Sequence, residues 1–321
     1  MKKLALLLGA LSLVSSVAYA KEVVPAVEEV VVVEEAAPVA AAPMLRVTNV
    51  GQYIEIDNYS RHREGKGAGN DNLDIGNVML GHNVGLAYGD DWTFNLMARK
   101  GWDTDTDDGF HSEGHRIDID AWRNFENFSV GARWRQEANM DRWLGRVKYN
   151  YGMFSGWVDA GYQFENKNEK PGEGNNDLIY SEGMPVAVTV GPVTVGYYYE
   201  YKDWNGTGSD NGEQTDEMSH QVRLMTPLYT GEKLSLGAEY RYQFLQDKEF
   251  ENEAGKKVAW QENNRHIAIL NANYALTENL SVYGYYQYEW NKYELQDGHQ
   301  GDRDQKDDYY GEFAIGWNYA F

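Results

Sequence analysis

Charged residues recur at alternate positions in several segments of this chain, with apolar residues between them. In the stretch that starts at Phe128, Arg133 and Arg135 alternate with Ala132 and Trp134. Successive side chains of a β-strand point to opposite faces of the sheet, so the charges of such a segment share one face. On that face they can pair across strands, or they can line an aqueous passage and set up an electric field across it.

The same alternation assigns two sets of charged side chains to one face of their strands, which is the inner face if the strands close into a barrel in a membrane. The basic set is Arg99, Arg116, Arg133, Arg135, Arg142, Arg146 and Lys148, which we expect to form a basic wall, together with Arg223, Arg241 and Arg265. The acidic set is Glu55, Asp57, Asp118, Asp120, Asp159, Glu200, Glu239, Glu289 and Glu312. A lipid-facing Arg or Lys would cost about 2–4 kcal/mol at the middle of a bilayer, so these charges must face inward. Two interpretations remain open: the charges brace the wall through salt bridges, or they also line a water-filled pore.

The end of the chain shows most clearly which element positions such residues. From Tyr309 to Phe321, aromatic and apolar residues occupy one face of a strand, and small or polar residues occupy the other. This is the unit of a transmembrane β-barrel, which presents apolar groups to lipid and polar groups to its lumen. The aromatic ending, with Trp317, Tyr319 and Phe321, also resembles the signal by which bacterial outer-membrane barrels are recognised for insertion.

Similar segments follow one another from Leu45 to Phe321. We expect strands at Leu45–Tyr59, Leu73–Tyr88, Trp92–Trp102, Arg116–Phe125, Phe128–Gln136, Arg142–Tyr151, Gly156–Phe164, Asp177–Val190, Val193–Trp204, Glu217–Leu228, Leu234–Asp247, Asn263–Leu276, Leu280–Leu295 and Asp307–Phe321. The sequence therefore predicts an all-β fold, a transmembrane antiparallel up-and-down β-barrel of about 14 strands. The 24 Tyr and 10 Trp fit the aromatic girdles of such barrels.

The connections alternate in length. Turns such as Gly89–Asp91 and Gly191–Pro192 are short, whereas stretches such as 61–72 and 296–306 are long and polar. Short periplasmic turns and long extracellular loops are typical of outer-membrane barrels, so both ends of the barrel domain should lie on the periplasmic side.

In two of the expected strands the alternation shows clearly which side chains face outward and which face inward, and in a third it does not. After Leu234, apolar residues such as Leu236 face outward and Arg241 faces inward; after Leu280, Tyr286 faces outward and Tyr285 inward. The segment from Arg265 to Tyr274 is ambiguous, because Ile267 and Ile269 share a face with Arg265.

The beginning of the chain predicts export. Lys2 and Lys3 precede an apolar run that ends in a small-x-small cleavage site, so residues 1–20 are expected to be a signal peptide. Residues 21–44, rich in Val, Ala, Glu and Pro, are expected to be a flexible periplasmic leader, and residues 45–321 to be the barrel. The predicted location is the bacterial outer membrane.

Composition excludes several classes of function. Cysteine is absent, which removes thiolate metal sites and cysteine nucleophiles. The net charge of −21 argues against a nucleic acid partner. The mean hydropathy of −0.65 resembles that of a soluble protein, but only half of each barrel strand needs to be apolar. The expected partners are outer-membrane lipids, the barrel-assembly machinery and small hydrophilic solutes, with no cofactor and no metal.

Enzyme and metal sites find little support, and we expect no enzyme. A barrel phospholipase would need Ser and His near a polar orienting group, but His111-Ser112 lies among acids. A barrel protease would need Asp/His pairs on facing strands, and His220 and His266 look like isolated residues at the bases of loops. The series Asp103, Asp105 and Asp107 departs from a calcium loop, with Asp108 in place of glycine and Glu113 one position early. His111 and His115 are expected to be solvated loop residues rather than ligands of a shared metal.

The chain resembles the outer membrane protein G-like porins over roughly Leu45 to Phe321. The resemblance rests on the segment Asn139-Met140-Asp141-Arg142-Trp143, on Asn264-Arg265, Leu280-Ser281-Val282 and Glu289-Trp290, and on the ending Gly316-Trp317-Asn318-Tyr319-Ala320-Phe321. It implies a fourteen-stranded channel, generally monomeric, that passes small hydrophilic solutes such as oligosaccharides with little specificity. A trimer remains the alternative assembly. The family's pH-gating histidine pair does not carry over, since Gln261 and Tyr293 stand at those positions.

Two functions from different classes follow. The first is an outer-membrane porin for passive diffusion of small hydrophilic solutes and ions. The second is an adhesin or structural barrel whose extracellular loops bind a ligand while the lumen is blocked, with Lys248 to Gln261 as the candidate plug.

Overall fold

The computed structural model describes residues 44–60, 73–103, 111–138, 140–165, 177–204, 213–251, 257–261, 264–291, 294–295 and 308–321. The predicted signal peptide and nearly all of the predicted leader lie outside these residues, as do the predicted loops 61–72 and 296–306. In the part of the chain that is described, no helix is long and apolar enough to cross a membrane.

All the regular structure is β-strand. The strands are β1 (Leu45–Ser60), β2 (Leu73–Tyr88), β3 (Trp92–Asp103), β4 (His111–Asn124), β5 (Phe128–Glu137), β6 (Met140–Tyr151), β7 (Phe154–Glu165), β8 (Leu178–Val190), β9 (Val193–Trp204), β10 (Glu213–Thr230), β11 (Leu234–Glu251), β12 (Lys257–Gln261), β13 (Arg265–Ala275), β14 (Leu280–Asn291), β15 (Glu294–Leu295) and β16 (Asp308–Ala320).

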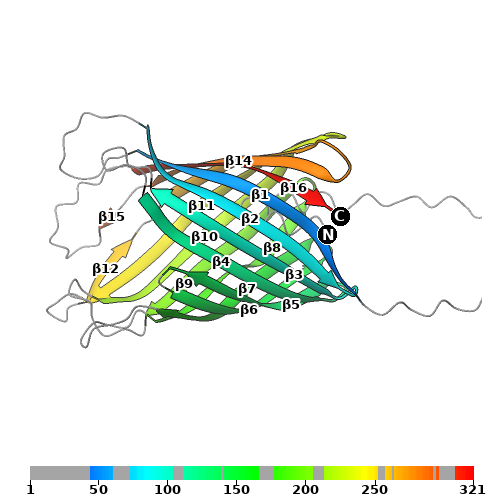
Figure 1. Cartoon of the computed structure of the whole chain (residues 1–321). Coiled ribbons are helices and arrows are strands. Elements are labelled where there is room, and N and C mark those ends of the chain that lie inside the picture. Colours follow the sequence, from blue (N-terminus) through cyan, green and yellow to red (C-terminus); the bar gives the residue numbers. More distant parts are fainter. Residues whose placement is uncertain are drawn as a thin grey trace, which may run out of the picture.

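Fourteen of these strands close into an antiparallel barrel (Figure 1). Each strand from β1 to β10 pairs with the next, β1 pairs with β16, and the pairing of β10 with β11 completes the ring. The short strands β12 and β15 pair beyond the end of the barrel. The prediction of an up-and-down barrel of about 14 strands is confirmed.

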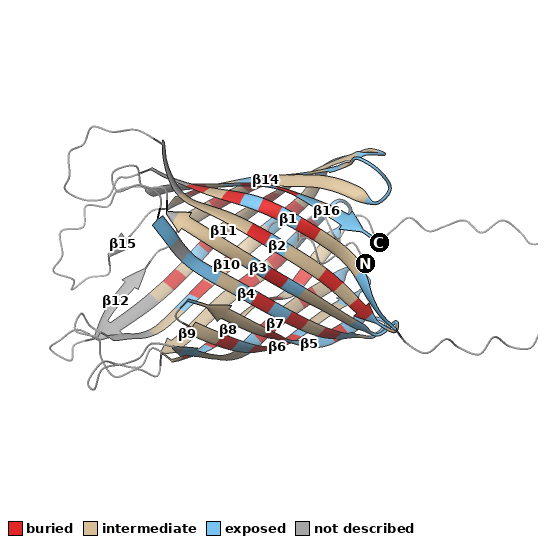
Figure 2. Ribbon diagram, viewed as in Figure 1, coloured by how far each residue is buried: buried red, intermediate tan, exposed pale blue. Residues whose placement is uncertain are grey.

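The barrel is apolar outside and charged inside. Along the strands, buried residues alternate with exposed ones (Figure 2). On β6, Trp143 and Val147 are 56% and 47% exposed, whereas Arg146 is 4% exposed. A soluble barrel keeps its charges on the outside, so this distribution is reversed relative to a protein dissolved in water.

The two ends of the barrel differ. At one end, which we call the turn end, consecutive strands join through short turns, and β1 begins and β16 finishes there (Figure 1). Gly152 and Gly191 have a φ of 59° in these turns, a conformation that glycine adopts without steric cost. The Phe321 backbone N–H donates to the Thr48 carbonyl at 3.0 Å and ties the two chain ends of the barrel together. The opposite end is called the loop end.

Several strands are longer than predicted at the loop end. β4 begins at His111 rather than Arg116. Gly114, with a φ of 46°, is the extra residue of a β-bulge where the register with β3 shifts, and the pairing continues beyond it. The candidate plug Lys248 to Gln261 is described only at residues 248–251 and 257–261, and these residues contribute to the sheet. β11 continues to Glu251, and β12 pairs back on it and continues the wall beyond the loop end (Figure 1).

A bulge in β8 reverses which positions face inward. Tyr180 and Met184, at even positions, are buried, but after Pro185 the buried residue is Ala187, at an odd position. The registers with β7 and β9 both shift at this point. Proline cannot donate a ladder hydrogen bond, and bulges are places where strands tolerate it.

Candidate functional site: the charged inner wall

The nineteen charged residues predicted to face inward all lie on barrel strands and are buried or half-buried. Asp120 is 0% exposed and Asp159 is 1% exposed. Buried carboxylates and guanidinium groups require partners, since an isolated buried charge is very costly. The partners define three regions of the inner wall.

The first region lies on β4 to β7 and consists of alternating acids and arginines. Asp120 accepts hydrogen bonds from Arg133 Nε and Nη2 at 2.7 and 2.9 Å, and from Arg146 Nη1 at 2.8 Å. Arg146 also donates to Asp159 at 2.9 Å. Asp118 in turn pairs with Arg116 at 2.6 Å. The expected basic wall is therefore an interleaved network in which acids of the same strands neutralise much of the charge.

A tryptophan lies beneath this network. The Arg146 guanidinium and the Lys148 ammonium lie 4.8 and 4.3 Å from the centroids of the Trp122 ring system, as cation–π contacts. Gly131 on β5 is required here, because a Cβ atom at this position would approach the Trp122 ring to 2.7 Å and the Ala121 carbonyl oxygen to 2.5 Å. The missing side chain on β5 lets groups from β4 and β6 meet across it.

Arg142 is bound differently from the arginines of the network. Its Nε and Nη2 donate to Gln163 Oε1 at 3.0 and 2.5 Å, and its guanidinium lies 3.9 Å from the Tyr180 ring centroid. Among the described residues, no carboxylate forms an ion pair with it. Arg142 therefore keeps a positive charge on the inner wall without a direct counter-ion.

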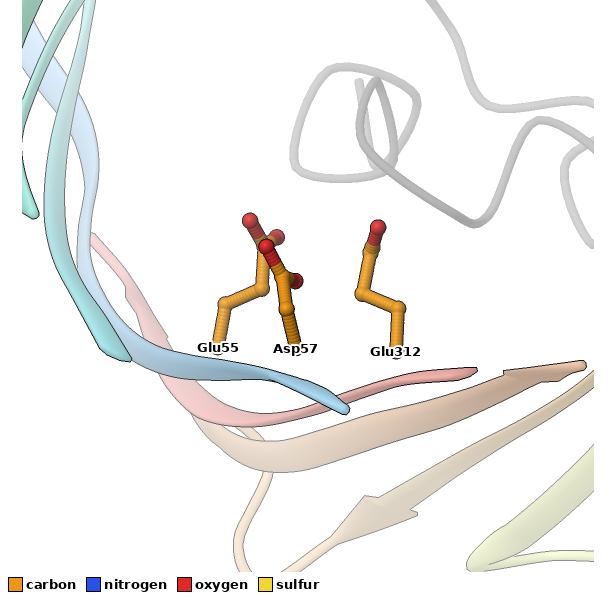
Figure 3. A group of neighbouring side chains, drawn as sticks. All are labelled: Glu55, Asp57 and Glu312. Carbon is orange, nitrogen blue, oxygen red and sulfur yellow. The ribbon is translucent and has the colours of Figure 1, made fainter. Parts of the chain in front are cut away.

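The second region is acidic and lies where β1, β14 and β16 meet. Oxygens of Glu55, Asp57 and Glu312 lie within 4.8 Å of one another, and the three side chains point to the concave inner side of the wall (Figure 3). The Tyr285 hydroxyl lies between two carboxylates, at hydrogen-bonding distance from Glu55 Oε2 (2.8 Å) and from Glu312. Arg99 Nη1 lies 3.7 Å from Glu55. Clustered carboxylates are the ligands that hard cations take, but here a hydroxyl and a guanidinium already hold two of the three groups.

The third region lies on β9 to β14 and mixes both signs. Arg241 pairs with Glu239 at 2.5 Å and Arg265 with Glu289 at 2.5 Å. Lys202 Nζ lies 3.3 Å from Glu200. All of these residues except Glu239 line a polar hollow, which the alternation of residues did not predict.

Sequence reasoning predicted Glu200 on the inner wall but missed Glu182, Tyr180 and Tyr198. Glu182 accepts a hydrogen bond from Tyr198 at 3.0 Å, and Glu200 accepts one from Tyr180 at 2.9 Å. The alternation Tyr180-x-Glu182 was a usable signal, but the Pro185 bulge hides it, because the apolar residues that follow have the opposite phase. No alternation rule indicates that each tyrosine bonds the glutamate of the neighbouring strand.

The structure corrects the expectation for two histidines. His220 lies within β10 rather than at a loop base, and His266 is the second residue of β13 and so does lie at a loop base, but neither histidine is isolated. Each His Nδ1 lies 2.6 Å from a tyrosine hydroxyl, that of Tyr197 and Tyr240 respectively. The His266 ring also stacks on Trp290 with centroids 5.1 Å apart. Both histidines belong to the aromatic surface of their strands.

Other predicted features fall partly outside the described residues. Asp105, Asp107 and Asp108 of the calcium-like series are not described, and neither is Tyr293. His111 and His115 are exposed on β4, and the His115 Nε2 lies 3.1 Å from Gln136 Nε2.

Comparison with known proteins finds similar solved structures at low sequence identity. No family model matches the chain, and no curated protein sequence matches it. Among solved structures, OmpT (in-vitro folded), an outer membrane protein of Vibrio cholerae, is 13% identical with a TM-score of 0.45, over 86% of this chain and 98% of that one. An anion-selective porin from Comamonas acidovorans is 14% identical with a TM-score of 0.42, over 87% of this chain and 100% of that one. The translocator domain of autotransporter NalP from Neisseria meningitidis is 14% identical with a TM-score of 0.41, over 86% and 89%. Likeness at this level carries no inference about activity.

Proposed function

We propose that this chain is an outer-membrane porin, a water-filled channel for passive diffusion of small hydrophilic solutes and ions. The observation that carries the proposal is the reversed distribution of polarity. Asp120, Arg146 and Asp159 are at most 4% exposed, whereas Trp143 and Leu270 are 56% and 58% exposed on the outer face. Such an exterior suits a bilayer, and such an interior suits water and hydrophilic solutes.

The strand number supports a channel rather than a filled barrel. Eight strands leave an interior just wide enough for side chains, whereas 16–18 strands leave an aqueous passage. Fourteen strands lie nearer the second case. The acidic cluster of Glu55, Asp57 and Glu312 lies on β1 and β16, whereas Arg142 keeps its positive charge on β6, so a field across the lumen would orient and select charged solutes.

Assembly and location follow from the same proposal. The chain would be exported by its signal peptide and inserted by the barrel-assembly machinery, which would read Trp317, Tyr319 and Phe321 on β16. Trp317 and Tyr319 are 37% and 36% exposed on the outer face, and Phe321 is 73% exposed. The resemblance to the outer membrane protein G-like porins favours a monomer and a broad range of solutes, including oligosaccharides.

The alternative function is a barrel whose lumen is blocked. In the described part of its candidate plug, residues 248–251 and 257–261, the backbone pairs as part of β11 and as β12 and continues the wall. This pairing favours an open lumen over a blocked one.

Solute exclusion tests the proposal. Vesicles that contain the folded protein should swell in isotonic glucose or maltose and should not swell in dextran of several kilodaltons, because a channel of this size passes small solutes only. Swelling no faster than that of protein-free vesicles in every sugar would overturn the porin assignment, and swelling that follows added dextran as readily as glucose would indicate a leak.

A further inference from the structure

A polar hollow opens in the inner wall where β9, β10, β11, β13 and β14 run next to one another. Its volume is about 330 Å³, and its lining includes the side chains of Arg223, Arg241, Gln243 and Glu289. This volume lies at the lower end of the range for small-molecule sites. The lining is almost entirely polar, so the hollow suits one small hydrophilic guest.

Two arginines face each other in this hollow. Arg223 on β10 and Arg241 on β11 are direct cross-strand partners. Like charges in this position destabilise a sheet unless something compensates them. Arg241 is compensated by Glu239 at 2.5 Å. For Arg223, no carboxylate among the described residues lies within ion-pair distance.

Arg223 is nevertheless held in one orientation. Its Nε donates to Gln221 Oε1 at 3.1 Å, and its guanidinium lies 3.6 Å from the Tyr198 ring centroid. Its two terminal nitrogens form no hydrogen bond to any residue that the structure describes. The planar fork of these two nitrogens is the part of arginine that binds carboxylate or phosphate oxygens two at a time.

Gln221, which accepts the hydrogen bond from Arg223, is itself held by a chain of buried amides. Gln221 donates to Gln243 at 3.3 Å, Gln243 donates to Gln246 at 2.7 Å, and Gln246 donates to Glu217 at 2.6 Å. Each amide NH2 group donates to the next residue of the chain, in the direction of Glu217. The carbonyl oxygen of each amide therefore points the other way along the chain, in the direction of Arg223. The guanidinium is thereby positioned by neutral groups, while the carboxylate that ends the chain stays three amides away.

We propose that this hollow is a binding subsite for a small hydroxylated solute that carries an oxyanion, a sugar acid or a sugar phosphate. The fork of Arg223 would bind the oxyanion, and Ser219, Gln287 and Glu289 of the lining would exchange hydrogen bonds with the hydroxyl groups. The inference rests on the proposed porin function and narrows it, because such a subsite would favour anionic sugars among the solutes that enter. A site that is already rigid binds with a smaller entropic cost.

Titration calorimetry on the full chain, folded in detergent micelles, tests the subsite with glucuronate, glucose 6-phosphate and glucose as probes. We expect one or both anionic sugars to bind about tenfold or more tightly than glucose, the difference that a charge-assisted pair supplies. Tighter binding of glucuronate alone would identify a subsite for carboxylates, and tighter binding of glucose 6-phosphate alone would identify a subsite for phosphates. Equal heats for all three sugars would overturn the proposal.

Three variants assign the effect to Arg223. Arg223→Gln should weaken binding of the anionic sugar about tenfold, and Arg223→Lys should also weaken it, because lysine keeps the charge but lacks the fork. Arg123→Gln is the control, since Arg123 also lies near an aromatic ring, 5.2 Å from the Phe125 ring centroid, but is exposed and lies outside the hollow; it should leave the affinity unchanged. Heat-modifiable gel mobility shows which variants fold. Unchanged affinity in a folded Arg223→Lys barrel would contradict the proposal.

Calorimetry measures binding whether or not the barrel conducts ions. The proposed porin function and the proposed subsite can therefore be contradicted separately. Binding by a barrel that conducts no ions would overturn the porin function and leave the subsite. Conduction by a barrel that binds none of the three sugars would overturn the subsite and leave the porin.

Discussion

Asp120 on β4 accepts two hydrogen bonds from the Arg133 guanidinium on β5, at 2.7 and 2.9 Å, and is 0% exposed. The same carboxylate accepts a third bond from Arg146 on β6, which reaches it across β5. One aspartate thus joins three strands of the wall. A buried ion pair is costly to form, but breaking it by removing one partner costs more.

The first prediction follows from this arrangement. Asp120→Asn should lower the free energy of unfolding by about 3–5 kcal/mol, because it leaves two buried guanidinium groups with one counter-charge fewer. Urea unfolding of the barrel in lipid vesicles measures the change. Asp90→Asn makes the same chemical change at an exposed turn position and should stay within about 0.5 kcal/mol of the unaltered protein. Equal stability of the two variants would show that Asp120 does not brace the wall.

The second prediction concerns the outer face. Leu270→Arg should prevent the barrel from folding into vesicles, because Leu270 is 58% exposed on the outer face and a charge there costs about 2–4 kcal/mol at the bilayer midplane. Asn273→Arg is the control on the same strand, at a half-buried position on the inner face. Heat-modifiable mobility reports the folded fraction. Equal folding of both variants would mean that the outer surface does not face lipid.

Much of the fold could be predicted because a strand has a period of two. The alternation of Arg133 and Arg135 with apolar residues indicates strand and facing together, whatever the neighbouring strands are. The ambiguity at Arg265 was real: Ile267 and Ile269 are 3% and 2% exposed and lie inside, where they pack with Tyr285. Where the inner wall carries an apolar patch, the polarity of a residue does not indicate whether it faces the lumen or the outside.

The partners of the charged residues could not be predicted. The contact of Arg146 with both Asp120 and Asp159 depends on the stagger between strands, which a single segment does not encode. The Pro185 bulge removes a further regularity, because it reverses facing within β8. The predicted ends of β10 and β11 at the loop end were too short for a related reason. Lys248 and Glu249 pair with Glu217 and Asp216 in a polar part of the sheet, where no alternation indicates a strand.

The third prediction concerns ion selectivity. Replacing Arg133, Arg135 and Arg146 together by Gln should shift the selectivity toward cations, because Asp118, Asp120 and Asp159 would lose those counter-charges. The reversal potential in a salt gradient measures the shift. The shift should shrink as salt rises from about 0.1 M to 1 M, since the screening length falls from about 10 to 3 Å.

A control separates the lumen from the rest of the barrel in this experiment. Arg123→Gln removes a positive charge from an exposed arginine that lies 5.2 Å from the Phe125 ring centroid, so the reversal potential should not move. If the triple variant leaves the low-salt reversal potential as unaltered as this control does, the three arginines brace the wall without facing the conducting path.

The fourth prediction concerns assembly. Phe321→Ala should reduce the amount of folded barrel in cells, because the assembly machinery would read the aromatic ending, and should leave refolding of the purified chain in detergent nearly intact, because the backbone N–H that bonds Thr48 is kept. Phe321 is 73% exposed and follows the last strand residue, so few contacts within the barrel depend on its side chain. Loss of refolding in detergent to the same degree as in cells would assign Phe321 a role in folding instead.

Planar-bilayer conductance of the purified full chain tests the central claim most directly, with folding verified beforehand by heat-modifiable mobility. A water-filled lumen of fourteen strands predicts stepwise current increases as single barrels insert, with a step size that rises with salt concentration. A folded barrel that inserts and produces no steps would contradict the account and would favour a blocked barrel with a structural or adhesive role.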